Sequence, residues 1–414
     1  MMHEGDVVRL FVEKLIYGGY GFSHYETRAC FVKNAIPGEI ADIRIEKVKA
    51  QYLNGIVENI VLPSPHRVLP CCPIVDNCGG CQWQHIAYHH QLFWKFNIVK
   101  ESFRRIAKIY SPPILSPLPC SNPFHYRTRT TLHVTGTELG YFKEGTHDIV
   151  PVENCPIIAA PLNNALNLYR KSISNEKLQR YGAHGKLNLL LINRTDDVLC
   201  FLEDNKGNQK KYLLKKGEQK IAPYRGDAVD MIDGMLFKRT AENFYQINFD
   251  QNKALIRCVL EYINPSPRDE ILELYCGSGN FSLFLARTGS WVTGIELSKT
   301  AVAEAFENAT LNKISTCRFV EANINNLNES FFKKKYTVIL LNPPRSGCPK
   351  TVLKGIVTAY PRTVVYVSCN PATLARDIKI LTAHGYNLVK IQPIDLFPQT
   401  WHIETVVLLR AKTE

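Results

Sequence analysis

The residue with the clearest potential for covalent chemistry is Cys369, in the tetrapeptide Ser368-Cys369-Asn370-Pro371. It follows an apolar run, 363–367, that predicts a buried β-strand, and Pro371 opens a segment with a helical pattern. Open α/β sheets bind their ligands at the carboxyl ends of the strands, so a cysteine there could act as a nucleophile. One cysteine after a valine-rich strand is also compatible with a small buried side chain.

Several other cysteines have the spacing of a metal site. Cys72, Cys78 and Cys81 form a C-x5-C-x2-C pattern around a Gly-Gly pair, and Cys155 is the candidate for a fourth ligand. Cys71 could compete, although adjacent cysteines rarely both reach one ion. Such thiolates suit zinc or an iron–sulfur cluster, and the spacing does not separate the two. Unligated thiols are the alternative.

A glycine-rich turn, residues 276–281, joins a predicted strand at 270–275 to a predicted helix at 282–287. The next predicted strand, 291–296, ends in Glu296, about 20 residues further on, where an acid can bind ribose hydroxyls. Phe281 takes the third glycine position of the dinucleotide motif. This favours S-adenosylmethionine, which has no phosphate, over NAD or FAD. Glu296 could also be an ordinary charge at a strand end.

Asn342-Pro343-Pro344-Arg345 follows the strand predicted at 336–341. An Asn-Pro-Pro sequence is typical of methyltransferases that act on exocyclic amino groups, in which the asparagine holds the target nitrogen. A proline-rich turn without a catalytic role is the alternative.

The elements that must position these residues fall into three regions. Closely spaced short strands between Asp6 and Ile60 predict a small OB-type barrel, and three prolines at 63–70 predict a linker. A long amphipathic helix is expected at 84–108, followed by a mixed α and β region. From 270 onward strands and helices alternate, which predicts a doubly wound parallel sheet.

The composition agrees with a multidomain protein that binds a polyanion. The chain has 414 residues, thirteen cysteines and a formal charge of +12. A basic excess favours nucleic acid as partner. The first residues lack a signal-peptide pattern, and no apolar run approaches the roughly 20 residues of a membrane span, so we expect a cytoplasmic protein. There, the cysteines are more often metal ligands or catalytic groups than disulfides.

Longer motifs resemble the RNA uracil-5-methyltransferase family along nearly the whole chain. In the C-terminal part these are FYQIN (244–248), ELYCGSGNF (273–281), LNPPRSG (341–347), VSCNP (367–371) and HIETV (402–406). Near the N-terminus, EKL (13–15), YGG (17–19), VKNAIPGE (32–39) and RIEKV (44–48) resemble the TRAM domain, an OB-type RNA-binding module.

The resemblance implies a multidomain fold in three parts. Residues 1–62 would form the TRAM barrel. A central α+β, RNA-binding domain with an iron–sulfur loop would comprise 67–83 and 117–243. A Rossmann-like class I methyltransferase domain would comprise 84–116 and 244–414, with the helix from about Gln84 to Ile114 packed on it.

The resemblance also implies a chemistry. C5 of uracil is a poor nucleophile until a thiolate adds to C6, and a base must afterwards remove the C5 proton. Cys369 would be the nucleophile and Glu404 the base. His402 would orient Glu404, and Cys276 would pack beneath the cofactor.

The implied cofactor ligands are distributed over the whole C-terminal domain. S-adenosylmethionine would be contacted by Gln246, Tyr275, Asn280, Glu296, Asn323 and Asn342. The ribosomal-RNA branch of the family would hold a [4Fe-4S] cluster on Cys72, Cys78, Cys81 and Cys155. One position departs from the family pattern, because Asn342 stands where the family usually has aspartate. We still expect activity, since Cys369 and Glu404 are present.

The expected substrate is a uridine of 23S rRNA, with the T-loop of tRNA as the alternative, and the expected state is a monomer. Two other functions compete with this assignment. An amino-group nucleobase methyltransferase would use the Asn-Pro-Pro motif and need no nucleophilic cysteine. An RNA-binding assembly factor would keep the fold without catalysis.

Overall fold

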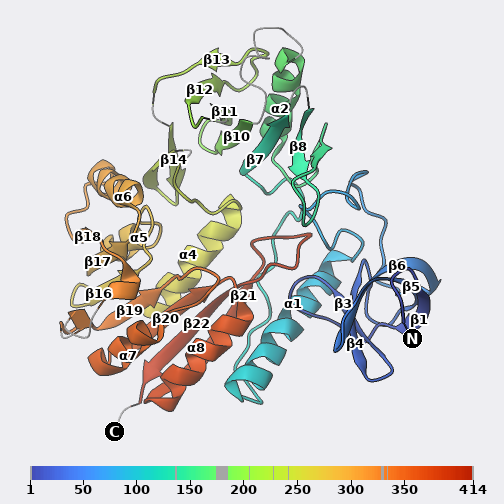
Figure 1. Ribbon diagram of the computed structural model, residues 1–414. Coiled ribbons are helices and arrows are strands. Elements are labelled where there is room, and N and C mark those ends of the chain that lie inside the picture. The colour runs from blue at the N-terminus through green and yellow to red at the C-terminus, as the bar shows by residue number, and fades with distance from the viewer. Residues whose placement is uncertain are drawn as a thin grey trace.

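The computed structural model describes residues 2–135, 138–173, 185–204, 206–226, 228–240, 242–327, 331–332 and 334–412. Within these ranges the strands form three large sheets and one two-stranded ribbon (Figure 1). No helix in the described ranges is long and apolar enough to cross a membrane.

The N-terminal sheet has six strands in the order β1-β5-β6-β4-β3-β2. Glu13 N donates to Phe22 O across 2.8 Å, so the chain beyond β1 closes against β3. Alternate residues of β5 and β4 point into a core built from Val32, Ile43 and Leu53. The strands are β1 (Val7–Phe11), β2 (Lys14–Leu15), β3 (Gly21–Tyr25), β4 (Arg28–Lys33), β5 (Ile40–Val48) and β6 (Tyr52–Leu62).

The central sheet is antiparallel, with helix α2 (Ala160–Ile173) packed against β10 and β11. Its order is β13-β12-β11-β10-β7-β8-β9, and a separate ribbon pairs β14 with β15. The strands are β7 (Arg129–Thr135), β8 (Glu138–Phe142), β9 (Ile149–Pro151), β10 (Gly185–Ile192), β11 (Asp197–Glu203), β12 (Gln209–Leu214), β13 (Ala222–Pro223), β14 (Ala228–Ile232) and β15 (Met235–Arg239).

The C-terminal sheet has seven strands in the order β18-β17-β16-β19-β20-β22-β21. The first five are parallel, as predicted, whereas β22 runs antiparallel to both of its neighbours. The strands are β16 (Glu270–Leu274), β17 (Trp291–Glu296), β18 (Cys317–Glu321), β19 (Val338–Leu341), β20 (Thr363–Ser368), β21 (Tyr386–Ile394) and β22 (Glu404–Ala411).

Helices cover both faces of this sheet, as its apolar strands require. Alternate strand residues separate the two cores: Ile339 and Leu341 face one side, while Val338 and Leu340 face the other. The second face packs against α4 (Phe249–Ile263), α5 (Ser282–Ala286) and α6 (Lys299–Leu311). The first packs against α7 (Lys350–Ala359), α8 (Pro371–Ala383) and α1 (Tyr88–Ser102), which continues as the π-helix η1 (Phe103–Ala107).

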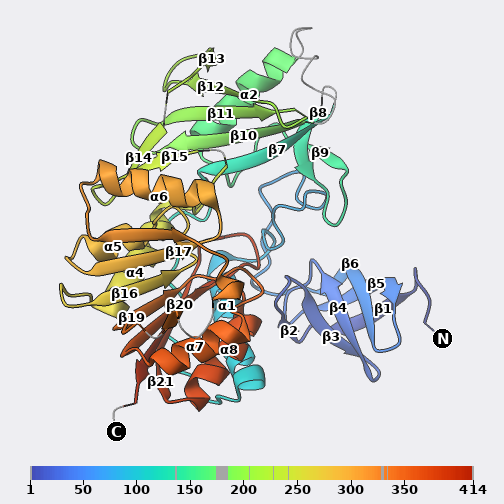
Figure 2. The same cartoon turned by 60° about the vertical axis from the view of Figure 1, so that its left-hand side comes forward.

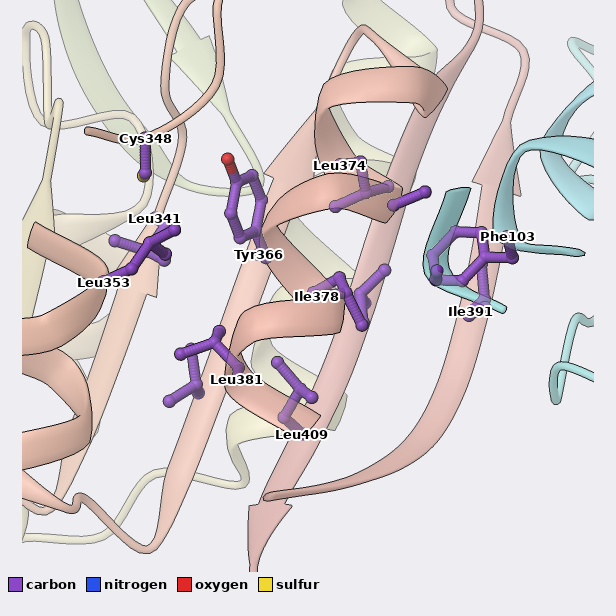
Figure 3. Packing of buried hydrophobic residues seen from close by; sticks show 14 of the residues in the cluster. Phe103, Leu341, Cys348, Leu353, Tyr366, Leu374, Ile378, Leu381, Ile391 and Leu409 are labelled. Atoms are coloured by element: carbon purple, nitrogen blue, oxygen red, sulfur yellow. The ribbon is translucent and has the colours of Figure 1, made fainter. Parts of the chain in front are cut away.

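The segment α1–η1 therefore packs on the C-terminal sheet although it precedes the central sheet in the chain (Figures 1 and 2). Figure 3 shows Phe103 of η1 beside Ile391 of β21, and Leu374, Ile378 and Leu381 of α8 lying over the sheet. The helix begins at Tyr88 and not at Gln84 as predicted, because residues 85–87 pair with residues 66–68 instead: Val68 N donates to His85 O and Ala87 N to His66 O.

Candidate active site and cysteine site

The strand register brings Cys369 and Glu404 together. Ser368, the last residue of β20, pairs with Thr405 of antiparallel β22, so the next residue on one strand faces the preceding residue on the other. Asn370 caps α8 through its side chain, which accepts from Ala372 N at 3.0 Å, and Pro371 occupies the first turn. Cys369 is thereby held in the short link between a buried strand and a capped helix, where it lines a cavity of about 1410 Å³ together with Glu404.

Two ionisable side chains act on the Cys369 thiol in opposite directions. Burial raises its pKa first and the Glu404 carboxylate raises it further, whereas Arg345 lowers it. The Arg345 loop is tied to the start of α8, because its carbonyl accepts from Asn370 Nδ2 at 2.9 Å and Thr373 Oγ1 at 3.1 Å. Arg345 is therefore a functional candidate, although the sequence pattern indicated it only as a member of a motif.

Glu404 is 4% exposed. Burial raises the pKa of this carboxyl to about 8, because the anion loses its hydration there. A carboxyl with such a pKa exchanges protons near neutral pH, which suits a general base.

His402 lines the same cavity as Glu404, but its ring nitrogens meet Arg345. Arg345 Nη2 is 3.3 and 3.4 Å from its two ring nitrogens, and the ring lies against Trp401 at a centroid distance of 3.9 Å. Burial and the Arg345 charge lower the pKa of His402 to about 3. The ring is therefore a neutral neighbour of Arg345 and not the partner that was expected for Glu404.

The six predicted cofactor residues all line the same cavity as Cys369 and Glu404. Glu296 accepts from the backbone N–H groups of Gly277, Leu297 and Ser298 at 2.8–3.1 Å, so its carboxylate holds the glycine turn as well as facing the cavity. Gly277 has φ +54°, and a Cβ built there meets no atom within 4 Å, so a side chain would project into open space. Tyr275 adopts a left-handed φ of 65° at the start of this turn.

The remaining four predicted cofactor residues differ in the hydrogen bonds that they make within the protein. Gln246 Oε1 is buried and accepts no hydrogen bond from the described residues, so it awaits a donor. Asn280 exchanges two bonds with Asn252 of α4, at 2.9 and 3.0 Å. Asn323 caps a short helix by accepting from Asn325 N. Asn342 extends β19 through a 3.3 Å backbone bond to Leu274 O.

Two aromatic residues near the site were not predicted as functional. Phe244 lines the cavity with 74% of its surface exposed. Tyr17, from the N-terminal barrel, donates its hydroxyl to Cys369 O at 3.2 Å. Phe244 could have been recognised by its place in the FYQIN motif, whereas the sequence around Tyr17 carries only the signal of the barrel.

The four predicted cysteine ligands line a second cavity, of about 390 Å³. The 72–81 loop meets β8, where Gly79 N donates to Phe142 O at 3.1 Å, and Cys155 follows β9. Asn163 fixes Cys155 by exchanging two bonds with its backbone, and Gln84 Oε1 accepts from Cys72 N at 3.2 Å. Sequence reasoning missed both supporting amides.

The thiols nevertheless do not form a preassembled ion site. In the described part of the chain, no group of three or more His, Cys, Asp or Glu side chains has a geometry that would hold a metal ion. The donor types fit a thiolate-bound group, while the present spacing fits no single ion. The cysteines thus gather as predicted, and the cluster itself is not supported by the geometry.

Two known families each match one part of the chain. Residues 226–412 match the family described as tRNA (Uracil-5-)-methyltransferase, and residues 3–57 match the TRAM domain. An uncharacterized RNA methyltransferase of Bacillus cereus is 32% identical, covering 99% of this chain and 97% of its own. One from Gloeobacter violaceus is 33% identical, covering 98% and 97%.

A solved structure resembles nearly the entire molecule. The Pyrococcus abyssi tRNA (uracil-54, C5)-methyltransferase, in complex with S-adenosyl-L-homocysteine, is 25% identical with a TM-score of 0.76, covering 97% of this chain and 99% of that one. Fold and site together therefore define an RNA methyltransferase. More narrowly, the chain belongs to the TRAM-containing RNA uracil-5-methyltransferase family and is an RNA (uracil-C5) methyltransferase.

Proposed function

We propose that the protein transfers a methyl group from S-adenosylmethionine to C5 of a uridine in folded RNA, with 23S rRNA as the substrate. The observation that carries this proposal is the register of β20 and β22, which sets a half-buried thiol opposite a buried carboxyl in one cavity with the glycine turn. C5 methylation requires one thiol and one carboxylate beside a methyl donor.

The cofactor would lie along the glycine turn, held by Gln246, Tyr275, Asn280, Glu296, Asn323 and Asn342. Two features support the fit. Within the part of the chain that the structure describes, Gln246 Oε1 has no donor, and the open space above Gly277 leaves room for a close ligand. When bound, S-adenosylmethionine supplies a methyl group on a positively charged sulfur. Glu296 would accept from the ribose hydroxyls.

The residues of this chain perform the remaining steps. Cys369 Sγ adds to C6 of the uracil, and the C5=C6 electron pair moves toward C5 and O4. C5 would then bond to the methyl group, whose bond to the cofactor sulfur would break with its electrons left on that sulfur, so that the demethylated cofactor would be the leaving group. Glu404 then takes the proton from C5, the C6–S bond breaks, and its electrons return to Cys369 as the double bond re-forms. Arg345 favours the thiolate that begins and ends this sequence.

The target uridine must leave its stack to reach this cavity, at a cost of a few kcal/mol. Phe244, exposed on the cavity wall, offers a ring against which an extruded base can stack. Asn342 offers an amide in the same cavity, with both a donor and an acceptor, in place of the family's usual aspartate.

The substrate RNA has a second candidate. The TRAM-like barrel together with Cys72, Cys78, Cys81 and Cys155 resembles the ribosomal-RNA branch, which is the reason for proposing rRNA. The domain division we propose is 1–62, 67–83 with 117–243, and 84–116 with 244–414. The matched family description and the Pyrococcus abyssi enzyme both name tRNA instead. We therefore keep the T-loop of tRNA as the alternative.

A [4Fe-4S] cluster on Cys72, Cys78, Cys81 and Cys155 is also part of the proposal. It rests on the family resemblance and on four thiols, the donor type that such clusters use, lining one cavity of about 390 Å³. Its role would be to join the 72–81 loop to the central sheet. Anaerobic purification with iron and zinc analysis separates the two, because zinc gives no brown absorbance.

The function is tested by mapping 5-methyluridine with mass spectrometry in RNA from cells with and without the gene, and with Cys369→Ala. Loss of one mark in 23S rRNA is expected. Loss from tRNA alone would replace the rRNA assignment, and unchanged methylation by Cys369→Ala would overturn the mechanism.

A further inference from the structure

A turn of the N-terminal barrel enters the catalytic centre. Tyr17, in the link between β2 and β3, donates its hydroxyl to the carbonyl oxygen of Cys369 at 3.2 Å, across a sequence separation of 352 residues. This contact joins the module that resembles an RNA-binding domain to the peptide of the proposed nucleophile.

The Cys369 carbonyl lies where regular secondary structure supplies no donor. The β20–β22 ladder ends at Ser368, and α8 begins its hydrogen bonding at Asn370 O, which accepts from Leu374 N at 3.0 Å. Pro371 has no N–H to offer. The Tyr17 hydroxyl therefore satisfies a carbonyl that falls between the two elements.

Several contacts hold the turn in place. The Tyr17 ring packs edge-on against Trp401 at a centroid distance of 4.7 Å. Trp83 Nε1 donates to Gly19 O at 3.1 Å. Gly19 has φ +92°, and a Cβ there would lie 2.7 Å from Trp401 Cδ1, so only glycine permits this approach.

The barrel core also continues into the catalytic core. Leu15 and Ile36 of the barrel belong to the same buried cluster as Phe103 and Ile391. The position of Tyr17 is thus fixed by the barrel and by the C-terminal domain. Burial and the negative charges of Cys369 and Glu404 raise the pKa of Tyr17 to about 12, so its hydroxyl remains a donor over the physiological range.

We propose that Tyr17 is a positioning residue for the nucleophile and that the barrel is a structural part of the catalytic centre as well as an RNA-binding module. The inference rests on the proposed function for its effect on turnover. The claim that the barrel holds the Cys369 peptide in place concerns the free protein alone, so it can be tested without RNA.

The test compares Tyr17→Phe with Tyr20→Phe. The first keeps the ring against Trp401 and removes the hydroxyl bond, while the second removes a hydroxyl from the same turn. For Tyr17→Phe we expect kcat to fall roughly three- to tenfold, because one hydrogen bond is lost. The KM for RNA should be unchanged. Tyr20→Phe is expected to match the wild type in both constants.

Alkylation by iodoacetamide reports the nucleophile directly. Trypsin releases Cys369 in peptide 363–376, which contains no other cysteine, so its labelling can be followed by mass spectrometry in the whole protein. Because the Cys369 peptide has lost the Tyr17 hydrogen bond, the Cys369 thiol of Tyr17→Phe should be alkylated roughly two- to fivefold faster than that of the wild type. Gly19→Ala, which displaces the turn by collision with Trp401, should act in the same direction.

The outcomes separate the two proposals. Unchanged kcat and unchanged labelling in Tyr17→Phe would overturn the positioning role. A rise in KM alone would assign the turn to RNA binding and also overturn it. Faster labelling in an enzyme whose wild type makes no 5-methyluridine would preserve the positioning of Cys369 and refute the proposed function.

Discussion

Replacing Glu404 by glutamine should stabilise the protein, and by an amount that grows with pH. The ordinary pKa of the carboxyl is 4.5, and burial raises it to about 8 in the folded state. Below 4.5 the group is protonated whether the chain is folded or unfolded, and it carries no penalty. Between these values the unfolded chain ionises while the folded one retains the proton, so stability falls as pH rises.

The size of the effect follows from the shift. Each pKa unit corresponds to about 1.4 kcal/mol, which gives an upper limit of about 3 kcal/mol at pH 7 and about 5 kcal/mol above pH 8. A glutamine is neutral at every pH and avoids this cost. The difference in stability between Glu404→Gln and the wild type should therefore be near zero at pH 4.5 and rise to a plateau above pH 8.

Thermal unfolding of the two proteins at intervals from pH 5 to 9 measures this difference. For a domain of 150–250 residues, each kcal/mol shifts the Tm by about 2–4 °C, so an advantage of several degrees is expected at pH 8. Glu273, whose pKa burial also raises to about 8, is present in both proteins and cancels. Glu321→Gln, which removes an exposed carboxylate from β18 of the same sheet, is the control.

A constant difference across this pH range would refute the reasoning, because it would mean that Glu404 ionises in the folded protein as it does in the unfolded chain. Destabilisation by glutamine at pH 8 would show that the carboxylate has a partner that compensates its burial. Either result would also remove the argument that Glu404 exchanges protons near neutral pH.

Three further changes test a buried ion pair and two residues of the site. Lys95 forms a fully buried ion pair with Asp395 at 2.6 Å, so Lys95→Met should cost about 3–5 kcal/mol in chemical denaturation, and adding Asp395→Asn should restore part of it. Arg345→Met should move the labelling profile of Cys369 to higher pH, since the cation that lowers its pKa is gone; an unchanged profile would exclude Arg345 from activating the thiol. Asn342→Asp should change kcat by less than about tenfold, within the range of one neutral hydrogen bond; a gain of several orders of magnitude would mean that the natural protein is impaired.

Much of the C-terminal fold could be predicted because its signals are local. Fully buried strands such as Val338–Leu341, alternating with helices, predict a doubly wound sheet without knowledge of distant contacts. The antiparallel direction of β22 is set by its pairing with β20 and β21, and alternation alone does not reveal it. The start of α1 was misplaced for a similar reason, because residues 85–87 pair with residues 66–68 and not within the helix.

The candidate site, too, could be predicted from the sequence only in part. Its members lie in motifs at strand ends, and parallel strands bring their ends to one edge, so the grouping of Cys369 with the glycine turn follows from local pattern and topology. The orientation of each side chain does not. His402 was expected beside Glu404, yet its ring faces Arg345, because side-chain direction depends on the packing of Trp401 and Phe397 around it.

Tyr17 marks the limit of prediction from local pattern. Its neighbours resemble a barrel turn, and nothing within that stretch indicates the carbonyl of a residue 352 positions away. The contact depends on how the barrel meets the C-terminal domain, through Leu15, Ile36 and Trp83, and the sequence pattern indicates each of these residues only as an ordinary core residue. A barrel joined so closely to the nucleophile would be expected to alter kcat when its turn is changed. A module that only captures RNA would alter KM alone. The separation of these two constants in Tyr17→Phe therefore decides whether the barrel belongs to the catalytic centre.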